Sequence, residues 1–142
     1  MKSNKEVLSS ITKTTQMGQL GIRCVLERAE NSKLREALRS QLKEYDMIEE
    51  EALNIAEQKN GQIQQLDPTV KLMASACTKA TLMMGNVDSR IAAMMINGNT
   101  RGLIKSIKNQ HHAQQEDPKI NKLAEKLIAH ESDNIRQMQE FL

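Results

Sequence analysis

Apolar residues recur in steps of three and four along nearly all of the chain. The rhythm is clearest at Val70, Cys77, Met84 and Ile91. Such a period places one apolar stripe along a helix and does not fit the alternation of a strand. The pattern therefore predicts an all-α protein whose helices bury their stripes against one another as a bundle.

The first helix is predicted over residues 3–29. Ser3 and Glu6 have the spacing of a capping box, in which a hydroxyl and a carboxylate satisfy the first free backbone amides. The inner stripe of this helix has small residues at its centre, among them Gly18. Glycine inside a helix costs about 1 kcal/mol relative to alanine, so Gly18 is expected to allow the close approach of a neighbouring helix.

A second helix is predicted to begin at Asn31 or Ser32, either of which can cap it, and to end at Asn60. Since the link to the first helix is only a few residues long, the two must be antiparallel neighbours. Asp67 and Pro68 then open a third helix, because a capping carboxylate is followed by a residue that has no amide to leave unpaired.

The third helix is predicted to extend to Gly98, and a break or kink at Gly85 is left open. A shorter amphipathic helix over residues 100–111 is expected to follow it. Asp117 and Pro118 repeat the start signal and open a last long helix that runs to the C-terminus.

These elements predict a four-helix bundle with an additional short helix before the last long one, in a single domain over residues 1–142. Each long helix has about 25 to 30 residues and would span ~40 Å. The link over residues 61–66 reaches at most ~21 Å, so it cannot run the length of such a bundle. Either the flanking helices are shorter than predicted, or the topology is simple up-and-down.

The composition fits a globular domain with an aliphatic core. Hydrophobic residues make up 39% of the chain and charged residues 27%, and the aromatic residues are Tyr45 and Phe141 alone. The 20 basic and 18 acidic side chains are mixed along the sequence, with a formal net charge of +2. No large single-sign field is therefore expected, and no nucleic-acid partner.

The localisation and the redox state follow from what the sequence lacks. No stretch approaches the ~18 apolar residues of a membrane span, and the first residues lack the apolar core of a secretory signal. We therefore expect a cytoplasmic protein with no membrane partner. Cys24 and Cys77 lie in apolar surroundings and are expected to be free thiols that pack as small hydrophobes.

Three carboxylates are candidates for a metal site inside the bundle. Glu131 lies on the inner line of the last helix, Asp88 lies near the inner line of the third, and Glu49 is at the edge of the stripe of the second. A buried carboxylate is costly unless it is paired, hydrogen-bonded or bound to a metal. These positions are therefore where a divalent metal ion would be sought.

The histidines and the other reactive residues form no catalytic pattern. His111 and His112 are expected at a solvated helix end, with weak transition-metal binding as the alternative, and His130 is expected at the surface. The sequence contains no glycine-rich phosphate loop, no zinc-type cluster and no triad in a suggestive context. Neither catalytic nor cofactor-binding residues are therefore assigned.

The segment IAAMMINGNTRG over residues 91–102, the ending over residues 123–142 and the four long helices resemble small bacterial ferritin-like four-helix bundles of unknown function. The resemblance implies a ferritin-like bundle as the alternative to an up-and-down one. Members of that superfamily that bind two irons use Glu-x-x-His on two helices. At that spacing Glu131 is followed by Asn134, so a di-iron centre is not expected here.

The methionines favour a role in association. Adjacent methionine pairs at 83–84 and 94–95 cannot both be buried by one helix face, and flexible methionine side chains suit adaptable interfaces. We expect a non-enzymatic helical bundle that forms a homodimer or other homo-oligomer and serves as an interaction or structural module. The alternative is a degenerate ferritin-like protein that holds a divalent metal ion or small ligand through the three candidate carboxylates.

Overall fold

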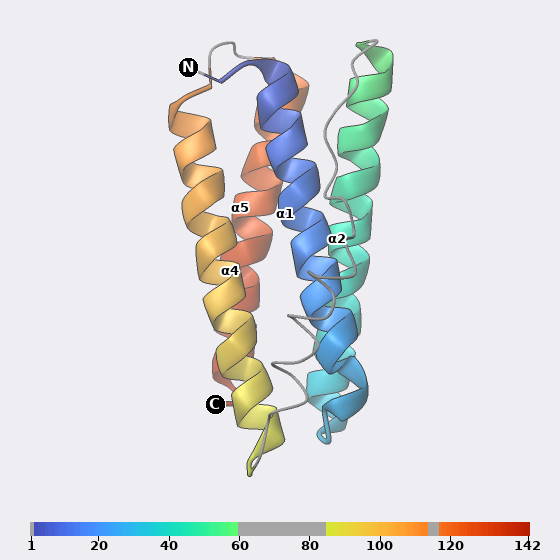
Figure 1. The fold of residues 1–142 in the computed structure, drawn as a ribbon, viewed down its shortest axis with the longest axis vertical. Coiled ribbons are helices and arrows are strands. Elements are labelled where there is room, and N and C mark those ends of the chain that lie inside the picture. The colour runs from blue at the N-terminus through green and yellow to red at the C-terminus, as the bar shows by residue number, and fades with distance from the viewer. Residues whose placement is uncertain (1, 60–84, 114–116) are drawn as a thin grey trace.

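The computed structural model describes residues 2–59, 85–113 and 117–142. These residues form an all-α four-helix bundle, which confirms the predicted fold class (Figure 1). The helices are α1 (Asn4–Val25), α2 (Ser32–Gln58), α4 (Val87–His111) and α5 (Pro118–Gln139), and a short 3-10 turn, η1 (Leu26–Arg28), follows α1. Within the described ranges the extended pairing is limited to one isolated bridge between Lys2 and Ala113.

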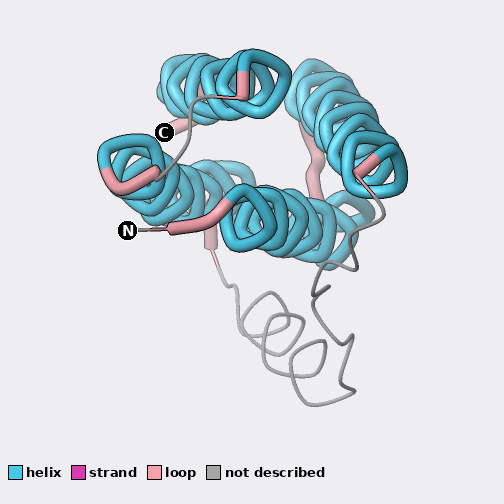
Figure 2. The backbone as a smooth tube through the Cα atoms, turned by 90° about the horizontal axis from the view of Figure 1, so that it is seen from above, coloured by secondary structure: helices cyan, strands magenta, loops and turns pink. Residues whose placement is uncertain are grey.

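The four helices pack as a square. Helix α1 lies against α2 and α4, and α5 lies against the same two helices, so α2 and α4 face each other across a diagonal (Figure 2). Every helix is antiparallel to both of its neighbours (Figure 1). Helices α2 and α4 therefore point in the same direction, and Gln58 and Val87 lie at opposite ends of the bundle.

In a simple up-and-down bundle each helix runs opposite to the one before it in the sequence. The four described helices do not follow this order, because α2 and α4 run in the same direction (Figure 1). The predicted start of the third helix at Asp67 and Pro68, and the predicted end of the second at Asn60, lie outside the described residues. The same holds for the link over residues 61–66.

The course of α4 corrects two helix boundaries that the sequence predicts, the end at Gly98 and the new start at Thr100. The helix starts after Gly85, which has a φ of +80°, and Asn86 caps it by accepting a hydrogen bond from Ser89 N at 3.2 Å, so a helix begins at the position where a break was considered. The separate short helix over residues 100–111 is wrong, because α4 continues through Gly98 without interruption. The cost of a helical glycine is only about 1 kcal/mol, and the packing of the helix against its neighbours outweighs it.

The other caps follow the prediction. Ser3 and Glu6 form a capping box, Asn31 accepts hydrogen bonds from the first amides of α2, and Asp117 caps α5 before Pro118. Helix α1 ends at Val25 instead of near residue 29, because the chain tightens into η1 directly after Val25.

The core is aliphatic, as the composition predicts. Its largest fully buried apolar side chains other than tyrosine are Leu8, Ile22, Leu34, Leu38, Ile48, Ile91, Leu123, Leu127 and Met138. Gly18 has a packing role, but it makes room for a side chain: a Cβ atom there would overlap the ring of Tyr45, which packs against the backbone of α1. None of the described helices is both long and apolar enough to cross a membrane.

The prediction of free thiols is wrong for Cys24, which is disulfide-bonded. The other cysteine of the chain, Cys77, lies outside the described residues. Disulfides are typical of oxidising compartments, so this bond does not support the predicted cytoplasmic localisation, which stays a prediction.

Candidate functional site

A cluster of polar side chains lies at the centre of the bundle, and we call Tyr45, Asn99 and Glu131 the polar cluster. The phenol of Tyr45 donates a hydrogen bond to Glu131 Oε1 at 2.6 Å, and Asn99 Nδ2 donates to Glu131 Oε2 at 3.0 Å. The same Asn99 Nδ2 lies 3.0 Å from the Tyr45 hydroxyl oxygen, which accepts from it. Each member comes from a different helix, so the cluster joins α2, α4 and α5.

Two glycines make room for these side chains. Gly18 on α1 leaves space for the Tyr45 ring, and a Cβ atom at Gly102 on α4 would lie 3.1 Å from the carboxyl carbon of Glu131. Because such a distance is tighter than ordinary van der Waals contact, the carboxylate fills the space beside Gly102. The cluster is therefore enclosed by backbone as well as by side chains.

The electrostatics of the cluster follow from burial. Glu131 is 1% exposed, and burial raises its pKa from 4.5 to about 7, against the opposing effect of the hydrogen bonds from Tyr45 and Asn99. Burial and then the nearby carboxylate hold the pKa of the Tyr45 phenol well above its usual range. Tyr45 therefore stays a hydrogen-bond donor, while Glu131 changes protonation near neutral pH.

His130 is buried, which corrects its predicted surface position. Its ring packs edge-on against the ring of Tyr45, with the ring centres 4.5 Å apart and the planes at 89°. Burial lowers the pKa of His130, and the charges of Glu44 and Asp133 oppose this effect. The neutral ring is therefore favoured beside the polar cluster.

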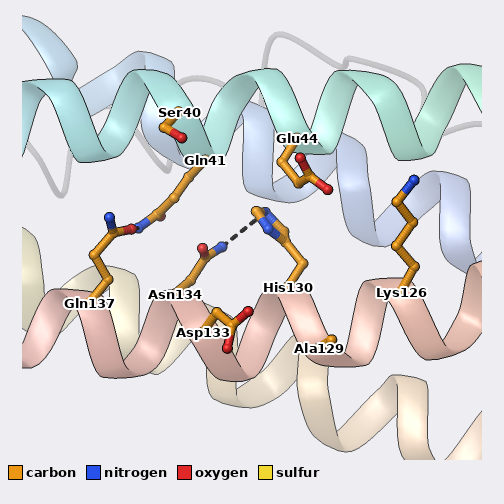
Figure 3. A pocket seen from close by; sticks show the side chains of 9 residues that line it. All are labelled: Ser40, Gln41, Glu44, Lys126, Ala129, His130, Asp133, Asn134 and Gln137. Atoms are coloured by element: carbon orange, nitrogen blue, oxygen red, sulfur yellow. Dashed lines mark hydrogen bonds between the residues drawn. The ribbon is translucent and has the colours of Figure 1, made fainter.

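A pocket of about 250 Å³ opens between α2 and α5 on the outer side of His130 (Figure 3). The pocket is also lined by Ser40, Glu44 and Asp133, which as residue types could suggest a hydrolytic triad. The His130 ring is already engaged, however, because Nε2 lies 3.0 Å from Asn134 Nδ2 and the ring hydrogen-bonds the backbone of Gln41. The imidazole is thus held by structural contacts and is not placed to activate a nucleophile.

Asp88 lies far from the polar cluster, at the start of α4. Its carboxylate accepts hydrogen bonds from Glu30 N at 2.8 Å and Asn31 N at 3.0 Å, and so ties α4 to the turn between α1 and α2. Asp88 stands eleven residues before Asn99 on one helix, which is about 16 Å along the axis. Its role is to join helix ends.

Glu49, the third candidate, is half-buried on α2, one turn beyond Tyr45. Its Oε2 atom is buried and has no hydrogen-bond partner among the described residues. Within the described part of the chain, no three His, Cys, Asp or Glu side chains gather closely enough to hold a metal ion. Glu131, Asp88 and Glu49 are therefore not brought together as one three-carboxylate site.

His111 and His112 lie where the sequence predicts, at the exposed C-terminal end of α4. The residues that sequence reasoning missed are the partners of Glu131. The sequence pattern gives Tyr45 no polar role, and Asn99 falls between the predicted end of the third helix and the start of the next. A signal for Asn99 exists in the steps of three and four that continue from Met95 through Asn99 and Gly102.

No protein-family model, curated protein or solved structure matches the chain. The resemblance to ferritin-like bundles therefore stays a prediction.

Proposed function

We propose that the protein is a non-enzymatic helical bundle that self-associates and serves as an interaction module, with the polar cluster specifying how its helices pair. One observation carries this proposal: both carboxylate oxygens of Glu131 accept hydrogen bonds from the protein itself. A buried carboxylate that takes its hydrogen bonds from two other helices favours the one register in which those donors reach it.

The enclosed state of Glu131 argues against the alternative of a degenerate ferritin-like metal or ligand site. A metal ion would compete with the hydrogen bonds from Tyr45 and Asn99 for the carboxylate oxygens, and it would need space beside Gly102 that the carboxylate already fills. The pocket of Figure 3 is not lined by Glu131. The chemistry of the interior thus favours a structural role.

Self-association is supported by exposed apolar side chains on three helices. Met17 on α1, Met47 on α2 and Ile104 on α4 are 45%, 47% and 49% exposed. Methionine is enriched at protein interfaces, where its flexible chain adapts to a partner surface. A homodimer that covers one of these side chains is the simplest assembly.

The test measures mass and metal content on the same untagged protein, purified from metal-supplemented cells. Light scattering over a wide concentration range is expected to give a dimer or larger assembly, and elemental analysis is expected to give far less than one metal per chain. Met17→Gln, Met47→Gln and Ile104→Gln are compared, and at least one is expected to shift the mass towards the monomer. The exposed Ala93→Gln variant is the control for adding a polar side chain.

A monomer at every concentration would overturn self-association. Stoichiometric iron, manganese or zinc that is lost in Glu131→Gln would overturn the structural reading of the polar cluster and favour the metal-binding alternative.

A further inference from the structure

Charge is divided between the two sides of the bundle. Helices α1 and α4 together carry seven basic and two acidic residues, whereas α2 and α5 together carry eight basic and ten acidic residues. Since α1 and α4 are neighbours, their excess of positive charge lies on one flank (Figure 2). The mixing of charges that the linear sequence suggests therefore does not extend to the folded helices.

The positive charge of this flank converges on a pocket of about 320 Å³. Four of the residues that line it are cationic, and we call Lys2, Arg101, Lys105 and Lys108 the basic pocket. The three on α4 follow one face at steps of four and three, so they span about 10 Å. None of the described residues that line the pocket is acidic.

Lys2 is fixed in place although it precedes the first helix. Its backbone N–H donates to the His112 carbonyl at 2.6 Å, and its ammonium group donates to Asn109 Oδ1, also at 2.6 Å. The Asn109 amide in turn bonds Ser10 on α1. The fourth cation is thus held against α4 by contacts with the last turn of that helix.

The cations of the pocket repel one another. Burial lowers the pKa of Lys105, and the charges of Lys13 and Lys2 lower it further. Among the described residues, the salt bridges do not include Lys2, Arg101, Lys105 or Lys108. An anion bound at this position would reduce the repulsion and would find ammonium and guanidinium donors on several sides.

We propose that the basic pocket binds the phosphate groups of a soluble polyphosphorylated anion. A volume of about 320 Å³ is within the range of small-molecule sites, and a face about 10 Å long can reach more than one phosphate group. Arginine and lysine are the side chains that bind phosphate best. Neither aromatic residue, Tyr45 or Phe141, lines the pocket, so recognition acts on phosphates and not on a stacked base.

The test uses inorganic tripolyphosphate as the probe and isothermal titration calorimetry at 50 mM salt. The variant Arg101→Gln/Lys105→Gln/Lys108→Gln is expected to weaken binding at least a hundredfold, because each lost charged contact costs about a factor of ten. The control Lys33→Gln/Arg39→Gln/Lys43→Gln on α2 changes the net charge equally and is expected to stay within about threefold. All six positions are exposed, and circular dichroism checks that each variant folds.

A second variant, Lys105→Gln alone, is expected to weaken binding about tenfold and keeps the test decisive if the triple variant folds poorly. The absence of saturable binding to the wild-type protein, or an equal loss in the α2 control, would overturn the proposal. Vesicles of phosphatidylcholine and phosphatidylserine form a separate arm. Vesicle binding without tripolyphosphate binding would overturn it in favour of a lipid surface.

Discussion

At the centre of the bundle one carboxylate is surrounded by hydrogen-bond donors, whereas the basic pocket on the α1–α4 flank brings four cations together with no acid among its described lining residues. In the first arrangement both carboxylate oxygens are satisfied by the protein itself, although Asn99 Oδ1 is buried without a partner among the described residues, and removal of the carboxylate leaves buried donors unsatisfied. In the basic pocket the cations have no acidic partner among the described lining residues, and their side chains remain in contact with water. Stability should therefore depend strongly on the polar cluster and weakly on the basic pocket.

The largest effect is expected for Glu131→Ala. This change leaves the Tyr45 hydroxyl and the Asn99 amide without their shared acceptor and opens a cavity, so the free energy of unfolding should fall by about 4 kcal/mol. Glu131→Gln keeps the shape and one acceptor oxygen and should cost about 1 kcal/mol. Chemical denaturation followed by circular dichroism measures both, and equal losses would show that the acceptor role is unimportant.

The pH dependence of stability should be the next largest effect. Since the pKa of Glu131 is raised from 4.5 to about 7, the folded state holds more protons than the unfolded state between these values. This group's contribution is full below pH 4.5 and is lost as the pH rises through 7, a change of up to about 3 kcal/mol.

Glu131→Gln is the control for this titration, because it has no proton to lose. The difference between the wild-type and variant curves isolates Glu131 from the other carboxylates. A difference that does not vary between pH 4.5 and 8 would contradict the shifted pKa.

A smaller effect is expected where α1 meets the polar cluster. Gly18→Ala forces a methyl group into the ring of Tyr45 and should lower the free energy of unfolding by about 2 kcal/mol. Gly98→Ala is the matched control, since Gly98 is exposed and a Cβ atom there meets nothing within 4 Å. Gly98→Ala should stabilise α4 by up to about 1 kcal/mol, so the melting temperatures of the two variants should shift in opposite directions.

The smallest effect, and one of opposite sign, is expected in the basic pocket. Lys105→Gln removes repulsion from Lys13 and Lys2 and should stabilise the protein by about 0.5 kcal/mol at low salt. The gain should disappear at 0.5 M salt, where surface charges are screened. Lys33→Gln on the acidic α2 should show no such gain, and a clear loss of stability in Lys105→Gln would mean that the pocket has a structural role.

The fold could be predicted where side chains act locally. Ser3, Asn31 and Asp117 each satisfy free amides of their own helix, so their sequence spacing was sufficient to place three helix starts. Gly98 shows the limit of this reasoning. Its low helix propensity suggested an end, but the packing of α4 against α5 and α1 decides the outcome.

The site could be predicted only in part, because its geometry is set by contacts between helices. The inner position of Glu131 follows from the helical period, but its bonds to Tyr45 and Asn99 join residues 86 and 32 positions apart. The basic pocket could not be predicted for the same reason, because its residues are brought together only by the fold. Charges that are mixed along the chain become unevenly distributed because helices of different net charge occupy different corners of a square.

The alternating directions of the helices have a further electrical consequence. Each helix carries a dipole along its axis, and in a square of antiparallel neighbours two dipoles oppose the other two and cancel (Figure 1). The charges of the side chains then set the field of the described bundle, and they differ between its two sides. A charged molecule that approaches by diffusion should therefore be steered by the side-chain charges and not by the helix dipoles.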